Sequence, residues 1–191
     1  MTEWRLFDGD LPHVSTFEFH EHRERAPHLE QADHRERLLK TARLVRQLNP
    51  ASVVDLGCGD GGLLSLIKDI PSWGYDWHPA SAQGWEQRGI TAEHRDVFGG
   101  RDVPRWGQVA VLTEVLEHVA DPHGVVEWVS RNAEYVVASS PRHETGERHG
   151  DCHAWAWDEE GYASLFAPHF EVLEHIGVAW SQIIAGRSRN T

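Results

Sequence analysis

Cysteine, lysine and long apolar runs are all scarce in this 191-residue chain. Its two cysteines, Cys58 and Cys152, cannot build a disulfide framework, which favours a reducing compartment. No apolar run reaches the roughly 18–20 residues that a membrane span needs. The first ten residues lack the basic and apolar regions of a signal peptide. We therefore expect a soluble, single-domain, cytoplasmic protein with no membrane partner.

Positive charge is also in short supply. The chain carries 18 Lys and Arg against 30 Asp and Glu, for a net charge of −12. This balance argues against a broad basic surface for DNA or other nucleic acid. A local basic groove remains open, because 16 of the 18 bases are arginine and several cluster before Arg46. The 40% hydrophobic and 25% charged content is that of an ordinary globular chain.

The hydrophobic pattern alternates between strands and helices. A helix is expected over about 29–48, where Asn49-Pro50 ends it. Strands are then expected at 52–57, 73–76, 91–94, 108–113 and 134–139, helices at 61–69, 80–88, 122–131 and 158–166, and last a hairpin of strands at 170–175 and 179–185 that turns at Gly177. This order predicts an α/β fold, a three-layer α-β-α sandwich with a mostly parallel sheet and one antiparallel strand.

A glycine-rich loop runs from Asp55 to Gly62, directly after the first expected strand of the sheet. Ligands of open α/β sheets bind at the carboxyl ends of the strands, and glycine lets the backbone approach them closely. The spacing is G-x-G-x-G, whereas a dinucleotide fingerprint needs G-x-G-x-x-G. The preceding Asp55 suits a ligand with a cationic head and suits a pyrophosphate poorly. Asp76 ends the next strand, where a carboxylate can accept hydrogen bonds from both ribose hydroxyls.

With its strand order and its Asp55–Gly61 motif, the chain resembles the class I S-adenosylmethionine-dependent methyltransferases. The resemblance covers about residues 50–185 and implies S-adenosylmethionine as cofactor and a seven-stranded sheet with a reversed last strand. It also implies that the three glycines line the cofactor, that Asp55 orients its amino-acid end, that Asp76 binds its ribose and that Asp96 contacts its adenine. The cofactor-binding residues expected on this basis are Asp55, Gly57, Cys58, Gly59, Gly61, Asp76, Trp77, Asp96, Val97 and Glu114.

The first 48 residues are expected to form an irregular arm and a helix, ahead of a core domain over residues 49–191. In the methyltransferase family, N-terminal helices often cover the cofactor, so this segment is expected to act as a lid. Its histidines and arginines favour either a lid or a solvated helix face; they are His20, His22, Arg23, Arg25, His28, His34, Arg35 and Arg37.

The segment Glu114-Val115-Leu116-Glu117-His118 follows the fourth expected strand. If it is helical, Glu114, Glu117 and His118 share one face and point into the cleft. Such a set of oxygen and nitrogen ligands suits Mg²⁺, Mn²⁺ or Zn²⁺. Without a metal, His118 is the candidate catalytic base.

The methyl acceptor leaves a weaker trace than the cofactor does. The segment after the fourth strand lacks the D/N/S-P-P-aromatic loop of amino-directed nucleic-acid methyltransferases, and neither cysteine follows a proline as in cytosine-C5 enzymes. We therefore expect methyl transfer to an oxygen or nitrogen of a small molecule. A cofactor-binding module without catalysis is a further alternative.

A second resemblance supplies the main alternative. The segments 114–118 and 148–155 look like those of small-RNA 3′-terminal 2′-O-methyltransferases, which are metal-dependent. The carry-over implies a metal held by Glu114, Glu117, His118 and either His149 or His153, and RNA as the partner. This chain departs from that pattern in having Ala156-Trp157 in place of Glu-Trp and in its acidic charge.

Overall fold

The computed structural model describes residues 2–6 and 28–190. The strands are β1 (Glu3–Arg5), β2 (Val53–Leu56), β3 (Ser72–Asp76), β4 (Ala92–His94), β5 (Val109–Thr113), β6 (Tyr135–Pro141), β7 (Trp155–Trp157), β8 (Phe170–Val178) and β9 (Ser181–Ser188). The helices are α2 (Ala32–Gln47), α3 (Gly62–Leu66), α4 (Ala82–Arg88), α5 (Pro122–Ser130) and α6 (Glu159–Phe166), with 3₁₀ turns η1 (Pro79–Ser81) and η2 (Leu116–His118).

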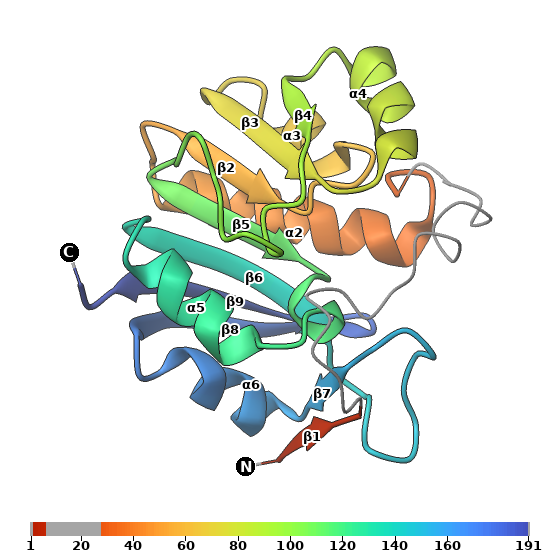
Figure 1. Cartoon of the computed structure of the whole chain (residues 1–191), viewed down its shortest axis with the longest axis vertical. Helices are drawn as coiled ribbons and strands as arrows, with labels where there is room; N and C mark the ends of the chain where they lie inside the picture. Colours follow the sequence, from red (N-terminus) through yellow and green to blue (C-terminus); the bar gives the residue numbers. More distant parts are fainter. Residues whose placement is uncertain (1, 7–27, 191) are drawn as a thin grey trace.

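Seven strands form one sheet in the order β4-β3-β2-β5-β6-β9-β8 (Figure 1). The first five strands in this order are parallel, and β9 runs antiparallel to both β6 and β8. The central strands are apolar runs such as Val53–Leu56, which suits strands that are buried on both faces. The α/β prediction, with a mostly parallel seven-stranded sheet, is confirmed.

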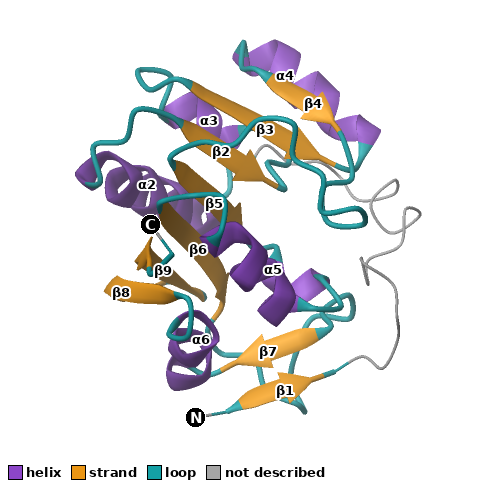
Figure 2. Ribbon diagram, turned by 60° about the vertical axis from the view of Figure 1, so that its left-hand side comes forward, coloured by secondary structure: helices purple, strands orange, loops and turns teal. Residues whose placement is uncertain are grey.

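Helices cover both faces of this sheet (Figure 2). Successive strand residues point to opposite faces, so Val53 packs with residues of α2, α3 and α4 while Val54 packs with residues of α5 and α6. After β2 the chain adds β3 and β4 on one side, and the connection from β4 to β5 then crosses to the other side of β2, which leaves a crevice at the carboxyl ends of β2 and β5.

The structure also contains a small second sheet that the sequence did not predict. Strands β1 and β7 pair antiparallel, with Glu3 opposite Trp157 and Arg5 opposite Trp155. The Trp157 indole N–H also donates a hydrogen bond to Glu3 Oε2 at 2.7 Å. The expectation of an irregular arm is therefore wrong for residues 3–5. The rest of the arm, including His20, His22, Arg23 and Arg25, lies outside the described residues.

The segment after β5 is not an α-helix. Glu114 has a left-handed backbone, with φ 54°, and only Leu116–His118 form a single 3₁₀ turn. The conditional expectation of one helical face for Glu114, Glu117 and His118 is wrong, because the chain reverses at Glu114 before the turn begins.

The turn expected at Gly177 is also wrong in position. Gly177 pairs with Gln182 inside the β8–β9 ladder, and the strands turn at Ala179 and Trp180, where Ala179 has φ 48°. A Cβ at Gly177 would collide with the Arg142 guanidinium. This glycine therefore permits a close approach.

Within residues 2–6 and 28–190, no helix combines the length and apolar character that crossing a membrane requires.

Candidate active site

A cavity of about 380 Å³ opens at the carboxyl ends of β2, β3 and β5. This volume lies in the usual range of small-molecule sites. Of the residues expected to bind the cofactor or a metal, ten line it, namely Asp55, Gly57, Cys58, Gly59, Asp76, Trp77, Glu114, Glu117, His118 and His153. Folding thus brings the glycine loop and the segment after β5 to one site.

The loop after β2 curls through glycines in the left-handed region. Gly57 has φ 86°, and a Cβ there would lie 2.6 Å from Val115 Cγ2. The amides of Gly57 and Cys58 both donate to the Tyr75 carbonyl at the end of β3, at 2.8 and 3.0 Å. The Gly59 amide donates to Asp76 Oδ2 at 2.9 Å. Only glycine gives the backbone this path along the cavity wall.

Asp55 is a buried carboxyl group on the cavity wall. It is 1% exposed, and neither of its oxygens has a hydrogen-bond partner among the described residues. Burial, with the nearby charges of Asp76 and Asp60, raises its pKa to about 8. Such an arrangement is costly unless a ligand supplies a cation or hydrogen-bond donors.

The two neighbouring acids are already engaged. Asp76 Oδ1 accepts from the His78 amide and the Ser81 hydroxyl at 2.9 and 3.0 Å, which fixes the carboxylate at the cavity edge. Asp60 accepts from Arg88 at 2.7 Å, and its bonds to Arg88 and His28 hold its pKa far below the usual range although burial alone would raise it. Asp60 therefore stabilises the glycine loop. Of these three acids, Asp55 is the one whose oxygens are available to a ligand.

Gly61, Asp96 and Val97 do not line the cavity. The Gly61 amide donates to the Cys58 carbonyl just before α3. Asp96 is exposed, and its Oδ1 accepts from the Phe98 and Gly99 amides. Val97 is buried in the core on the α5 side of the sheet.

At the opposite side of the cavity, α2 reaches across to the segment after β5. Arg37, 5% exposed, forms an ion pair with Glu114 at 3.2 Å. The other Glu114 oxygen accepts from the Ser139 hydroxyl at 2.9 Å. Glu114 is thereby committed to protein partners on both oxygens, which leaves it poorly placed as a metal ligand.

Glu117 is the second buried acid of the cavity. It is 1% exposed, and its carboxyl oxygens have no hydrogen-bond partner among the described residues. Burial, followed by the nearby charge of Glu114, raises its pKa well above the usual range. The Glu117 carbonyl accepts from the Ala154 amide at 2.6 Å, which ties η2 to the segment before β7.

This backbone hydrogen bond between residues 117 and 154 places His118 close to His153. The rings of His118 and His153 meet edge to face with centroids 4.7 Å apart. His153 Nδ1 donates to Glu144 Oε2 at 2.6 Å. Burial opposes the charged form of His153, but hydrogen bonds with Cys152 and Glu144 and the nearby Glu117 charge raise its pKa to about 10. His149, the other predicted choice, is exposed and bonds to the Gly150 carbonyl.

A family comparison identifies the class of protein. The model of a methyltransferase domain matches residues 19–173. The chain belongs to this methyltransferase family. The resemblance inferred from Asp55–Gly61 is therefore confirmed, as is the prediction that the chain is a methyltransferase. None of the curated proteins compared with this methyltransferase matches it in sequence.

Solved structures share the fold of this methyltransferase at low identity. The N-methyltransferase NodS from Bradyrhizobium japonicum WM9, in complex with S-adenosyl-L-homocysteine, is 15% identical with a TM-score of 0.74, covering 91% of this chain and 96% of that one. The methyltransferase domain of a bacterial Hen1, CtHen1-C, is 18% identical with a TM-score of 0.65, covering 80% and 97%. Magnesium protoporphyrin IX methyltransferase from Synechocystis PCC 6803, with bound S-adenosylmethionine, is 16% identical with a TM-score of 0.64, covering 82% and 80%.

Several residues that line the cavity of this methyltransferase were not predicted from the sequence to contact a ligand. Phe98 lines the cavity two residues beyond the predicted Asp96, and Val119 lines it just after His118. Gln31 and Leu38 line it from α2 and the turn before it. Only the arginine and histidine content of the α2 segment hinted at a role there. Gln31 and Leu38 reach the cavity because of how α2 packs against the sheet, and no local motif encodes that packing.

Proposed function

We propose that the chain binds S-adenosylmethionine in this cavity and transfers its methyl group to an oxygen or nitrogen of a small molecule. The observation that carries the proposal is Asp55, a buried carboxyl group that lies beside the glycine-loop backbone and has no hydrogen-bond partner among the described residues. The bound cofactor supplies a methyl group on a cationic sulfonium and carries an α-ammonium group. Either cation offsets the burial of the Asp55 charge, whereas a pyrophosphate would add to the repulsion.

The residues present fit this cofactor from one end of the cavity to the other. Asp55 and the backbone of Gly57–Gly59 stand where its amino-acid end is expected. Asp76, held by three donors, keeps acceptor capacity for ribose hydroxyls. Trp77 and Phe98 offer aromatic surface for the adenine in place of the Asp96 side chain, which is turned to its own loop.

The acceptor is proposed to lie beside η2. Glu117, His118 and His153 line that side of the cavity and supply carboxyl and imidazole groups that can hold an acceptor or take its proton. Methyl transfer to an activated sulfonium depends mainly on proximity and orientation. His118 is therefore the proposed base only where the acceptor carries a proton and no metal occupies the His118 ring nitrogen.

The N-terminal segment is proposed to act as a lid over the core domain. Its support is that His28, His34 and Arg37 line the cavity from α2 and the turn before it, and that the His28 amide donates to Asp60 of the glycine loop. Residence in the cytoplasm is proposed on the strength of the two free cysteines.

One observation favours the RNA alternative. His118 and His153 lie next to each other, as two ligands of the metal in a 2′-O-methyltransferase of RNA 3′ ends would. The engagement of Glu114 by Arg37 and Ser139 and the net charge of −12 weigh against it.

Transfer of a labelled methyl group from S-adenosylmethionine tests the proposal. We expect label in one member of a panel of small hydroxy and amino compounds. Label confined to RNA with a free 2′-hydroxyl at its 3′ end, and absent from RNA ending in a 2′-deoxynucleotide, would move the RNA alternative to first place. Tight cofactor binding without transfer to any acceptor class would instead indicate a binding module.

A further inference from the structure

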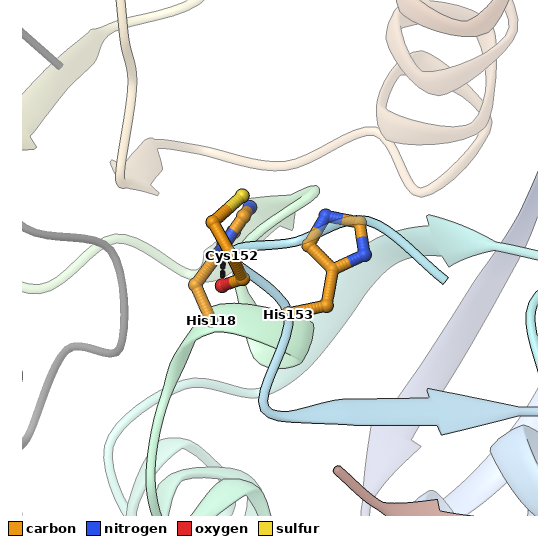
Figure 3. Close-up of side chains that lie close together, drawn as sticks. All are labelled: His118, Cys152 and His153. Atoms are coloured by element: carbon orange, nitrogen blue, oxygen red, sulfur yellow. Dashed lines mark hydrogen bonds between the residues drawn. The ribbon is translucent and has the colours of Figure 1, made fainter. Parts of the chain in front are cut away.

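Three possible metal ligands converge on the acceptor side of the cavity (Figure 3). One ring nitrogen each of His118 and His153 and the Sγ atom of Cys152 all lie within 4.8 Å of one another. The side chains come from two segments, η2 and the loop before β7, and in Figure 3 they point to the same side. Cys152 is a free thiol and half-buried.

Hydrogen bonds from the protein fix the two imidazoles through their Nδ1 atoms. His118 Nδ1 donates to the Cys152 carbonyl at 3.1 Å, drawn as the dashed line in Figure 3. His153 Nδ1 donates to Glu144 Oε2 at 2.6 Å, and Glu144 Oε1 in turn accepts from the Gly150 amide at 2.9 Å. A metal would therefore be bound through Nε2. Metal-binding histidines usually have this carbonyl or carboxylate partner on the second ring nitrogen.

The donor set differs from the oxygen-rich one that the sequence suggested. Glu114, one of the carboxylate ligands that the resemblance implied, is already bonded to Arg37 and Ser139. A thiolate with two imidazoles favours Zn²⁺ over Mg²⁺ or Mn²⁺, which prefer oxygen. Three protein ligands beside a cavity also match zinc sites that keep one position open.

We propose that His118, Cys152 and His153 form a Zn²⁺ site whose fourth position faces the cavity. Glu117 lies buried beside the site, and its carboxyl oxygens have no hydrogen-bond partner among the described residues. The Glu117–Ala154 backbone bond holds the two ligand-bearing segments together before a metal arrives. A role for this metal in orienting the acceptor rests on the proposed function, whereas metal binding does not.

Cobalt is the probe, because a Co²⁺–thiolate bond gives a charge-transfer absorption that reports the sulfur ligand directly. Chelator-treated full-length chain is titrated with Co²⁺ and, separately, with Zn²⁺ against a chromophoric chelator. We expect one metal per chain and a thiolate–cobalt band. Cys152→Ser should abolish the band, and His118→Ala and His153→Ala should each weaken Zn²⁺ binding by at least tenfold. Glu144→Gln, which removes the carboxylate partner of His153, should weaken it by about 10–100-fold.

The chain offers matched controls. Cys58→Ser changes the other cysteine, and His149→Ala changes a histidine four residues before His153; both should keep the metal and the band. Circular dichroism and urea unfolding establish that each variant is folded, and neither readout needs the cofactor or a methyl acceptor. The proposal is overturned if the wild-type chain binds no stoichiometric metal, if the band survives in Cys152→Ser, or if the control variants lose the metal as readily as the ligand variants.

Discussion

At the scale of single residues, the site contains buried groups whose hydrogen bonding among the described residues is incomplete. Asp55 is the clearest, since both carboxyl oxygens lack partners among the described residues. The sequence predicted this residue and its glycines because one short motif carries them all. It did not predict Arg37, Phe98 or Glu144 as partners at the site, because folding brings them there from distant segments.

The raised pKa of Asp55 has a consequence for stability. Its carboxyl stays protonated in the folded chain up to about pH 8 but ionises near 3.8 when unfolded. The folded state thus binds more protons, and the free energy of unfolding falls as pH rises between these values. Asp55→Asn should flatten this fall, measured as melting temperature between pH 5 and pH 9. Identical slopes for the two proteins would show that Asp55 does not titrate as described.

Gly57 of the glycine loop is expected to be difficult to replace. Gly57→Ala places a Cβ 2.6 Å from Val115, a β-branched side chain with little freedom to move. Gly89→Ala is the control, because Gly89 is also left-handed, with φ 58°, but its nearest neighbour would lie 3.9 Å away. Urea unfolding should show Gly57→Ala less stable than Gly89→Ala by about 1–3 kcal/mol. Equal losses would mean that backbone strain alone matters.

At the scale of elements, α2 links the N-terminal segment to the site. Its arginines make two different ion pairs, one buried at the cavity and one on the surface. Arg37 is 5% exposed and meets Glu114, whereas Arg46 is largely exposed and meets Asp69 at 2.6 Å. Burial, not the length of the pair, decides which one matters.

Arg37→Ala should therefore cost about 3 kcal/mol in the free energy of unfolding, because it leaves Glu114 without its cation. Arg46→Ala on the same helix should have little or no measurable effect. Replacing Glu114 as well, in Arg37→Ala/Glu114→Gln, should recover part of the loss. Urea denaturation of the four proteins checks this. The buried pair is unimportant if the two single variants are equally stable.

Some of the strands and turns were predicted from the sequence, and others were not. The alternation of apolar runs and glycine turns predicted every strand of the large sheet, and the central strands β2 and β5 bury nearly all of their residues. The β1–β7 pair was missed, because it joins residues 3–5 to residues 155–157 and neither three-residue strand has a periodicity of its own. The left-handed backbone at Glu114 was missed because no local sequence pattern marks it.

At the scale of the whole molecule, the fold and the family follow from local patterns, and the acceptor does not. The same fold occurs in an N-methyltransferase, a Hen1 methyltransferase domain and a magnesium protoporphyrin IX methyltransferase, each 15–18% identical to this chain. Substrate choice depends on the side chains that α2, η2 and the loop before β7 bring to one cavity. Those three segments come together only in the folded chain.

Binding of S-adenosylmethionine, measured by calorimetric titration of the chelator-treated chain, tests the central claim most directly. We predict one site per chain, weakened at least tenfold in Asp55→Ala and unchanged in Asp69→Ala, which alters an exposed aspartate that does not line the cavity. A nicotinamide dinucleotide should give no binding heat. Absence of S-adenosylmethionine binding, or equal affinity in wild type and Asp55→Ala, would contradict the account.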